Sequence, residues 1–259
     1  WCGTCRTCRA GQIQRCERGG IFGSGVAFGG LGGAMAEKVR VPWADSCLSL
    51  IPAAVTDAQA LAVGDILSTG WTAVDRAVSA PGQTIVVLGA GPIGLSAVHA
   101  ARLSGVRQVI AVDTVADRRA VAAQLGADRV VDPTSEDVAA VVHDLTAGRG
   151  AEAIVEAAGV PATIGSWTEL AAIGATVSMV AIPGGPVDIP VGAMQMKNIS
   201  LWTGLGDLGH MDMLLDLIVT GVLDLTPIFT ETVEFADIER AIADFIDRKE
   251  GLIKPLITV

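Results

Sequence analysis

Four of the five cysteines fall within the first sixteen residues, in the pattern C-x2-C-x2-C-x7-C. They are Cys2, Cys5, Cys8 and Cys16. Four thiolates can enclose a zinc ion tetrahedrally, and close cysteine spacings are typical of such sites. A site closed by four protein ligands has no open coordination position, so it would fold a lobe of the chain rather than carry out a reaction. The sequence therefore predicts a structural zinc site.

Two other uses of these cysteines fit less well. Cysteines three residues apart are poorly placed to form disulfides, and the rest of the chain offers only Cys47 as a partner. Iron–sulfur proteins also use C-x2-C-x2-C, but their fourth cysteine comes sooner and precedes proline, whereas Cys16 precedes Glu17. Four flanking arginines would offset the charge of a zinc ion bound by four thiolates. They are Arg6, Arg9, Arg15 and Arg18.

A glycine-rich turn, GAGPIG at residues 89–94, matches the pattern G-x-G-x-x-G. It follows an apolar run and opens a helical segment, which is the context that a dinucleotide-binding turn requires. Gly89 would allow the tight turn, Gly91 the approach of a pyrophosphate, and Gly94 the close packing of the helix. The helix N-terminus would supply amide donors to the phosphates. The candidate coenzyme residues in this turn are Gly89, Gly91, Pro92, Ile93 and Gly94.

Acidic and basic residues follow the apolar runs. Asp113 ends the second run, where its carboxylate could accept hydrogen bonds from both ribose hydroxyls and would repel a 2′-phosphate, which favours NAD over NADP. Arg118 could reach the same ribose or simply be solvated. Glu156 ends the fourth run, where it would either face the cofactor cleft or be solvated.

Six short apolar runs alternate with segments that are mostly helical in pattern. Such an alternation predicts an α/β fold in which helices cover both faces of a doubly wound parallel sheet. The runs are residues 84–91, 109–113, 129–133, 153–159, 176–182 and 199–204.

Before and after these runs the pattern differs. Thr56 and Gln59 form a plausible capping box before a helix over residues 60–78. The other expected elements are a loop at 19–33, a strand at 35–45, helices at 210–221 and 236–249, and strands at 231–235 and 254–259.

Composition excludes some kinds of partner. The 259 residues carry 28 acidic and 18 basic side chains, a net charge of −10, which argues against nucleic acid and anionic membranes as partners. No apolar run of membrane-spanning length is free of glycine, proline and charge. The length suits one or two domains, and a 51% apolar content can fill a sizeable core.

The cysteine lobe, CGTCRTCRAGQIQRC, and the GAGPIG turn with its following VIAVD resemble the zinc-dependent medium-chain alcohol dehydrogenases over essentially the whole chain. The resemblance implies a Rossmann domain joined to part of a β-rich, GroES-like catalytic domain. It implies a cytoplasmic homodimer or homotetramer that transfers a hydride between NAD and a small alcohol or carbonyl substrate. The implied divisions are a partial catalytic domain at 1–66, a dinucleotide-binding domain at 67–204 and a return to the catalytic domain at 205–259.

The resemblance also assigns individual residues. VGDILSTGW resembles the segment that carries the third ligand of the family's catalytic zinc, which implies Asp65 as that ligand. The other implied coenzyme residues are Thr69 and Ile93 at the nicotinamide, Val180 and Ile182 at its carboxamide, and Lys254 at the pyrophosphate.

The family's other two catalytic ligands lie upstream of its cysteine lobe, and this sequence begins within that lobe. We therefore expect an N-terminally truncated chain with an incomplete catalytic zinc site and no activity of its own. Alternatives are a polyol- or threonine-type dehydrogenase of the same family, or a non-catalytic protein that binds zinc and a nucleotide.

Overall fold

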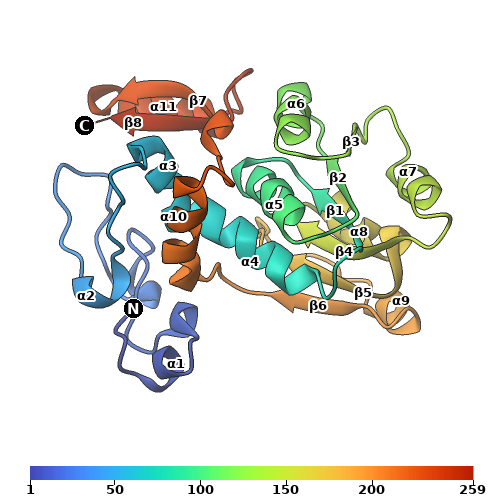
Figure 1. Cartoon of the computed structure of the whole chain (residues 1–259), viewed down its shortest axis with the longest axis horizontal. Helices are drawn as coiled ribbons and strands as arrows, with labels where there is room; N and C mark the ends of the chain where they lie inside the picture. Colours follow the sequence, from blue (N-terminus) through green and yellow to red (C-terminus); the bar gives the residue numbers. More distant parts are fainter. Residues whose placement is uncertain (259) are drawn as a thin grey trace.

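The computed structural model describes residues 1–258 and contains a six-stranded parallel sheet in the order β3-β2-β1-β4-β5-β6 (Figure 1). The doubly wound sheet is thereby confirmed, because each of the six apolar runs supplies one of its strands. The strands are β1 (Thr84–Leu88), β2 (Gln108–Val112), β3 (Arg129–Val131), β4 (Ala151–Glu156), β5 (Ala171–Met179) and β6 (Ser200–Thr203).

Both faces of the central strands β1, β2 and β4 are buried, which explains why these strands are mostly apolar. In β1, Ile85 and Val87 pack into one core cluster, and Val86 and Leu88 pack into the other. Helices α4 (Ser68–Ala77), α5 (Pro92–Leu103) and α6 (Ala116–Gln124) contribute to the first cluster. Helices α7 (Val138–Leu145), α8 (Pro161–Leu170) and α9 (Val191–Met196) contribute to the second.

The strand order reverses between β1 and β4. Ile85 of β1 is paired with Val109 of β2 on one side and with Ala153 of β4 on the other. In open parallel sheets, ligands bind outside the carboxyl ends of the strands at such a reversal. The ends of β1 and β4 therefore locate the candidate site.

A long helical segment leads into the sheet. Helix α3 (Asp57–Ala62) begins at the predicted capping box: the Thr56 hydroxyl accepts from the backbone N–H of Gln59, and the Gln59 side chain accepts from the backbone N–H of Thr56. The segment then continues through one π-helical turn, η3 (Val63–Leu67), into α4. The helix expected over residues 60–78 is confirmed, with the π turn as an unpredicted feature.

The N-terminal 83 residues contain no strand, so the strand expected at 35–45 is wrong. That segment is mostly irregular and exposed and ends in α2 (Ala44–Cys47). An apolar alternation forms a strand only where another strand pairs with it, and none lies alongside it within residues 1–258. The glycine-rich stretch at 19–33 forms loops and turns, as predicted, and α1 (Arg6–Arg9) lies among the cysteines.

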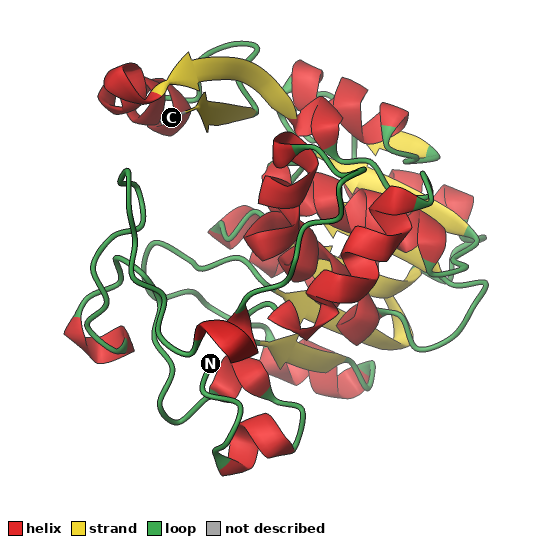
Figure 2. Cartoon of the chain, turned by 60° about the vertical axis from the view of Figure 1, so that its left-hand side comes forward, coloured by secondary structure: helices red, strands yellow, loops and turns green. Residues whose placement is uncertain are grey.

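The C-terminal part contains helices α10 (Met211–Val219) and α11 (Ile238–Ile246) and strands β7 (Phe229–Glu234) and β8 (Lys254–Thr258). The two strands pair in parallel, and Figure 2 shows them apart from the large sheet. Residue 259 of the predicted last strand lies outside the described residues. Within residues 1–258, no helix has the length and apolar character needed to cross a membrane. Strand β6 is an edge of the large sheet, and the expected homo-oligomer stays a prediction.

Candidate coenzyme and zinc sites

The turn between β1 and α5 requires its glycines for different reasons. Gly89 has φ +90°, and a Cβ there would lie 2.9 Å from the backbone nitrogen of Ala158. A Cβ on Gly94 would lie 1.8 Å from the carbonyl oxygen of Gly89. Gly91 is different, because a Cβ there would meet no protein atom within 4 Å. Space over Gly91 is therefore free for a ligand, whereas the other two glycines are required by the fold.

Helix α5 begins directly at this turn. Gly91 is its N-cap residue and provides no side-chain cap, and Pro92 occupies the first helical position, which its fixed φ suits. The amides of the first turn therefore have no side-chain acceptor from the cap, and such amides are suited to phosphate oxygens. Ile93 is half-buried beside them.

Asp113 contacts the glycine turn. Its Oδ2 accepts a hydrogen bond of 2.7 Å from the backbone N–H of Ala90, and its Oδ1 accepts one of 2.8 Å from Val115. The carboxylate thus joins the end of β2 to the turn after β1 and holds both in one arrangement. A carboxylate oxygen has more than one lone pair, so each remains able to accept from a ribose hydroxyl.

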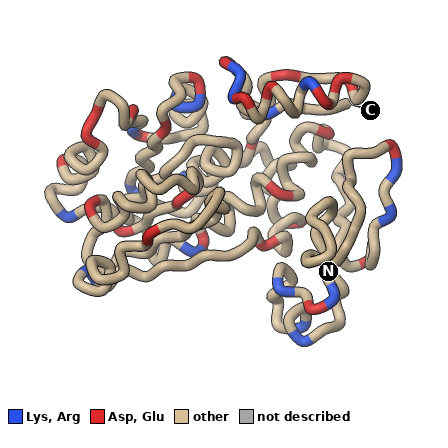
Figure 3. The backbone as a smooth tube through the Cα atoms, turned by 180° about the vertical axis from the view of Figure 1, so that it is seen from behind, with Lys and Arg blue, Asp and Glu red and all other residues tan. Residues whose placement is uncertain are grey.

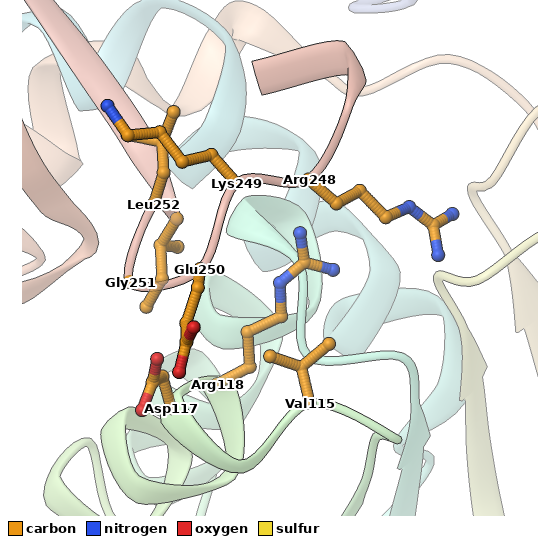
Figure 4. A pocket seen from close by; sticks show the side chains of 9 residues that line it. Val115, Asp117, Arg118, Arg248, Lys249, Glu250, Gly251 and Leu252 are labelled. Carbon is orange, nitrogen blue, oxygen red and sulfur yellow. The ribbon is translucent and has the colours of Figure 1, made fainter. Parts of the chain in front are cut away.

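Arg118 lies at a small pocket between the start of α6 and the loop of residues 248–253 that joins α11 to β8 (Figure 4). In the figure its guanidinium group points toward this loop, which contains Arg248 in the left-handed region at φ 54°. Val115, which donates to Asp113, also lines the pocket, so Arg118 is near the expected ribose position. Its contact with the ribose stays a prediction.

Lys254 interacts with α11. It begins β8, and its Nζ lies 5.0 Å from the centre of the Phe245 ring on α11. Its predicted contact with a pyrophosphate would require the side chain to leave this cation–π interaction, which is worth about 0.5–1 kcal/mol at an exposed site.

The π turn presents Asp65 on the surface, and the hydroxyl of Thr69 donates a 3.3 Å hydrogen bond to its Oδ1. Single π turns within helices occur frequently at functional sites. Thr69 itself is buried.

The two residues that the resemblance places at the nicotinamide carboxamide differ in exposure, because Val180 is buried whereas 85% of Ile182 is exposed. Exposure of so large an apolar side chain in the loop after β5 leaves a surface that a flat ring could cover.

Glu156 is fully buried, so it is not the solvated residue that the sequence allows as an alternative. Its Oε1 accepts from the backbone N–H groups of Ala158 and Gly159 at 2.9 and 2.8 Å, and its Oε2 accepts from Trp167 Nε1 at 3.2 Å. Burial raises the pKa of Glu156 above its ordinary value, and these hydrogen bonds partly oppose that effect. Because Ala158 packs on Gly89, the carboxylate holds the loop after β4 against the glycine turn.

The four lobe cysteines converge. Their Sγ atoms all lie within 4.8 Å of one another, and those of Cys5 and Cys16 are 3.9 Å apart. Zinc–sulfur bonds of about 2.3 Å place tetrahedral sulfurs about 3.8 Å apart, so the four sulfurs fit a zinc ion. Within residues 1–258 this is the only group of three or more histidine, cysteine or acidic side chains that could hold a metal, so Asp65 is not part of such a group.

Backbone amides surround these sulfurs. The N–H of Cys2 donates to Cys16 Sγ at 3.3 Å, and that of Cys5 donates to Cys2 Sγ at 3.4 Å. The four arginines of the lobe are exposed, and Figure 3 shows basic residues gathered there. The groups closest to the sulfurs are thus backbone amides and hydroxyls rather than guanidinium groups.

The thiols differ in acidity. The hydroxyl of Thr7, followed by the backbone N–H of Cys8, lowers the pKa of Cys5 to about 5. The backbone N–H of Thr4 is the main cause that lowers the pKa of Cys2 to about 7. Burial, followed by the neighbouring thiols, raises the pKa of Cys8 to about 12. The thiols of Cys2 and Cys5 therefore ionise more readily than an ordinary thiol, and a bound cation would favour ionisation of Cys8 as well.

Comparison with known proteins supports the fold described above and the family resemblance. Residues 92–216 match the family model described as zinc-binding dehydrogenase. An alcohol dehydrogenase of Cupriavidus necator is 34% identical over 89% of this chain and 64% of its own length. A scyllo-inosose 3-dehydrogenase of Thermotoga maritima is 32% identical over 92% of this chain and 62% of its own length. The chain thus spans less than two thirds of these curated relatives.

A solved structure extends the comparison to every residue of the chain. Alcohol dehydrogenase TADH from Thermus sp. ATN1 superposes with a TM-score of 0.93 at 33% identity and covers 100% of this chain and 76% of that one. Matches of this extent, together with the cysteine lobe and the coenzyme turn, establish that the chain belongs to the zinc-dependent medium-chain alcohol dehydrogenase family.

Proposed function

We propose that this protein is a zinc-dependent oxidoreductase that transfers a hydride between NAD and an alcohol or its carbonyl form. The observation that carries the proposal is the free space over Gly91 at the N-terminus of α5, next to a carboxylate, Asp113, that is already joined to the turn. A pyrophosphate needs the first feature and an adenosine ribose needs the second. The names of the relatives support the reaction class.

Residues 67–204 would then form the dinucleotide-binding domain, and residues 1–66 and 205–259 would belong to the catalytic domain. In this arrangement Thr69 and Ile93 would contact the nicotinamide ring, and the backbone of residues 180–182 would hold its carboxamide. Each role rests on the family resemblance together with the exposure of Ile182 and the burial of Thr69.

Two zinc roles follow in this proposal. The four lobe cysteines would hold a structural ion, and Asp65 would be one ligand of a catalytic ion. When bound, the catalytic zinc would stabilise negative charge on the substrate oxygen. Asp65 belongs to no group of three or more possible metal ligands within residues 1–258, so a polypeptide of these residues alone should bind one zinc and oxidise no alcohol.

A second substrate class is a cyclic polyol. The Thermotoga maritima relative is named for an inosose, and it is nearly as similar to this chain as the alcohol dehydrogenase of Cupriavidus necator. In a protein whose catalytic zinc site is complete, the rates of oxidation of a simple alcohol and of a cyclic polyol would distinguish the two classes.

The coenzyme assignment can be tested by calorimetric titration with NAD and NADP. We expect NAD to bind more tightly, because Asp113 would repel a 2′-phosphate. The double substitution Asp113→Asn with Thr114→Arg should shift the preference toward NADP by about tenfold or more, since the asparagine retains an acceptor for Ala90. Asp144→Asn, which removes an exposed carboxylate on α7, serves as the charge control. Equal affinity of the unmodified protein for both coenzymes would contradict the role of Asp113.

A further inference from the structure

The segment that follows β6 lies directly on α4. The backbone N–H of Asp207 donates a 2.9 Å hydrogen bond to the hydroxyl oxygen of Thr72, 135 residues earlier in the chain. The same hydroxyl donates at 2.7 Å to the carbonyl of Ser68 one helical turn back. Thr72 is fully buried, so loss of its hydroxyl would leave the N–H of Asp207 without this partner.

Gly206 makes the closest approach in this contact. A Cβ at Gly206 would lie 2.4 Å from Thr69 Oγ1 and 2.9 Å from Thr69 Cα. The φ of Gly206 is not in the left-handed region, so glycine is needed here for space rather than for backbone conformation. The backbone at Gly206 therefore restricts the side chain of Thr69.

The restriction reaches the candidate site. Thr69 Oγ1 lies between Gly206 and Asp65, and its hydroxyl donates to the Asp65 carboxylate. Within the segment itself, Asp207 Oδ1 accepts from the N–H of Gly209, and on the other side Ile13 of the cysteine lobe lies beside Gly209. The segment at residues 204–210 is thus held between α4 and the lobe.

We infer that Gly206 and Thr72 are positioning residues for the nicotinamide end of the coenzyme site. They fix the segment after β6 on α4, so that the hydroxyl of Thr69 faces Asp65 and its side chain forms a rigid wall of the site. This inference rests on the proposed function, since it assumes that Thr69 adjoins the nicotinamide. The adenosine end, at Gly91 and Asp113, is built by other contacts and does not depend on this one.

The test compares the affinity for NADH with that for ADP-ribose, which lacks the nicotinamide. Gly206→Ala should weaken NADH binding by about tenfold and leave ADP-ribose binding within about twofold of the unmodified protein, because only the nicotinamide wall is displaced. Gly192→Ala in α9, where a Cβ would meet no atom within 4 Å, should leave both affinities unchanged.

A second pair of variants keeps the inference testable if Gly206→Ala does not fold. Thr72→Val removes the hydroxyl with little change of shape and should weaken NADH binding selectively, and Thr72→Ser should restore it because it keeps the hydroxyl. Equal losses for NADH and ADP-ribose, or no loss of NADH affinity, would overturn the inference and leave the proposed function standing. Failure of the unmodified protein to bind ADP-ribose would instead contradict the proposed function, and the inference with it.

Discussion

Strands β1 to β5 bury apolar side chains on the large sheet, whereas the described residues 1–56 bury only Cys2, Cys5, Cys8 and Val55 among their apolar residues. The same N-terminal region leaves nine large apolar side chains exposed. They are Ile21, Val26, Phe28, Met35, Val39, Trp43, Leu48, Leu50 and Ile51. Hydrophobic burial is thus sufficient to organise the sheet but not the N-terminal region.

The two regions therefore depend on different physical causes. In the sheet, each strand is paired with a neighbour and the central strands are covered on both faces, so removal of one contact leaves many others. In the lobe, four sulfurs and a few amide donors are the main contacts, and a bound metal would account for most of the stability. We therefore expect removal of the metal to affect the cysteine lobe, and disruption of the core packing to affect the sheet.

The largest expected effect is the loss of the lobe metal. Cys8→Ser should reduce zinc from one ion per chain to none and open the lobe, because apparent binding energies of structural zinc are about 10–16 kcal/mol and act as folding energy there. Elemental analysis measures the zinc. Trypsin should then cleave rapidly at the four arginines of residues 6–18, while the sheet remains protected.

The matched control is Cys47→Ser, which removes a thiol that donates to nearby backbone carbonyls outside the cluster. This variant should retain its zinc. A brown protein with iron–sulfur absorption, or full zinc content in Cys8→Ser, would show that the lobe is held in another way.

The next effect separates packing from ligand binding within one turn. Gly94→Ala places a methyl group 1.8 Å from the Gly89 carbonyl oxygen and should cost about 3 kcal/mol or more of unfolding free energy. Gly91→Ala meets no protein atom and should change that free energy by less than about 0.5 kcal/mol, yet weaken NAD binding. Urea unfolding and calorimetric titration measure the two quantities. Unchanged NAD affinity in Gly91→Ala would mean that the coenzyme does not approach this turn.

Much of the sheet was predictable because its determinants are local. Six apolar runs with intervening helical patterns were enough to place all six strands, and the cysteine spacing alone predicted a cluster. The strand at 35–45 was wrong because its apolar alternation is visible in sequence but the pairing it needs is not. The π turn at Asp65 also has no sequence signature that distinguishes it from an ordinary helical turn.

The site was less predictable because its contacts join distant segments. The hydrogen bond between Asp113 and Ala90, and the close approach of Gly206 to Thr69, depend on how the strands and helices are arranged in three dimensions. Glu156 was visible as a strand-end acid, but only the structure reveals that three N–H groups hold it in the interior. In the sequence, the glycine at position 206 was the one available signal of the close approach to Thr69.

A smaller effect concerns charge within the packed region. Because burial raises the folded-state pKa of Glu156, the stability associated with its neutral form is present below its ordinary pKa and is lost as pH rises through the raised value. Relative to Glu156→Gln, the natural protein should therefore lose unfolding free energy as pH rises from about 4. Urea unfolding at several pH values measures the difference. A difference that stays constant, or grows with pH, would contradict the effect of burial.

The smallest effect lies at the junction of the two regions, where α3 begins. Thr56→Ala removes the hydroxyl that accepts from the Gln59 N–H and donates to Gln59 Oε1, and should lower the unfolding free energy by about 1 kcal/mol. Thr56→Ser retains the cap and should stay within a few tenths of the natural value. Because α3 leads through the π turn into α4, the loss should appear in the unfolding of the sheet and leave the zinc content unchanged. A variant that lost zinc as well would show that α3 couples the lobe to the sheet, and the two regions would then unfold as one unit.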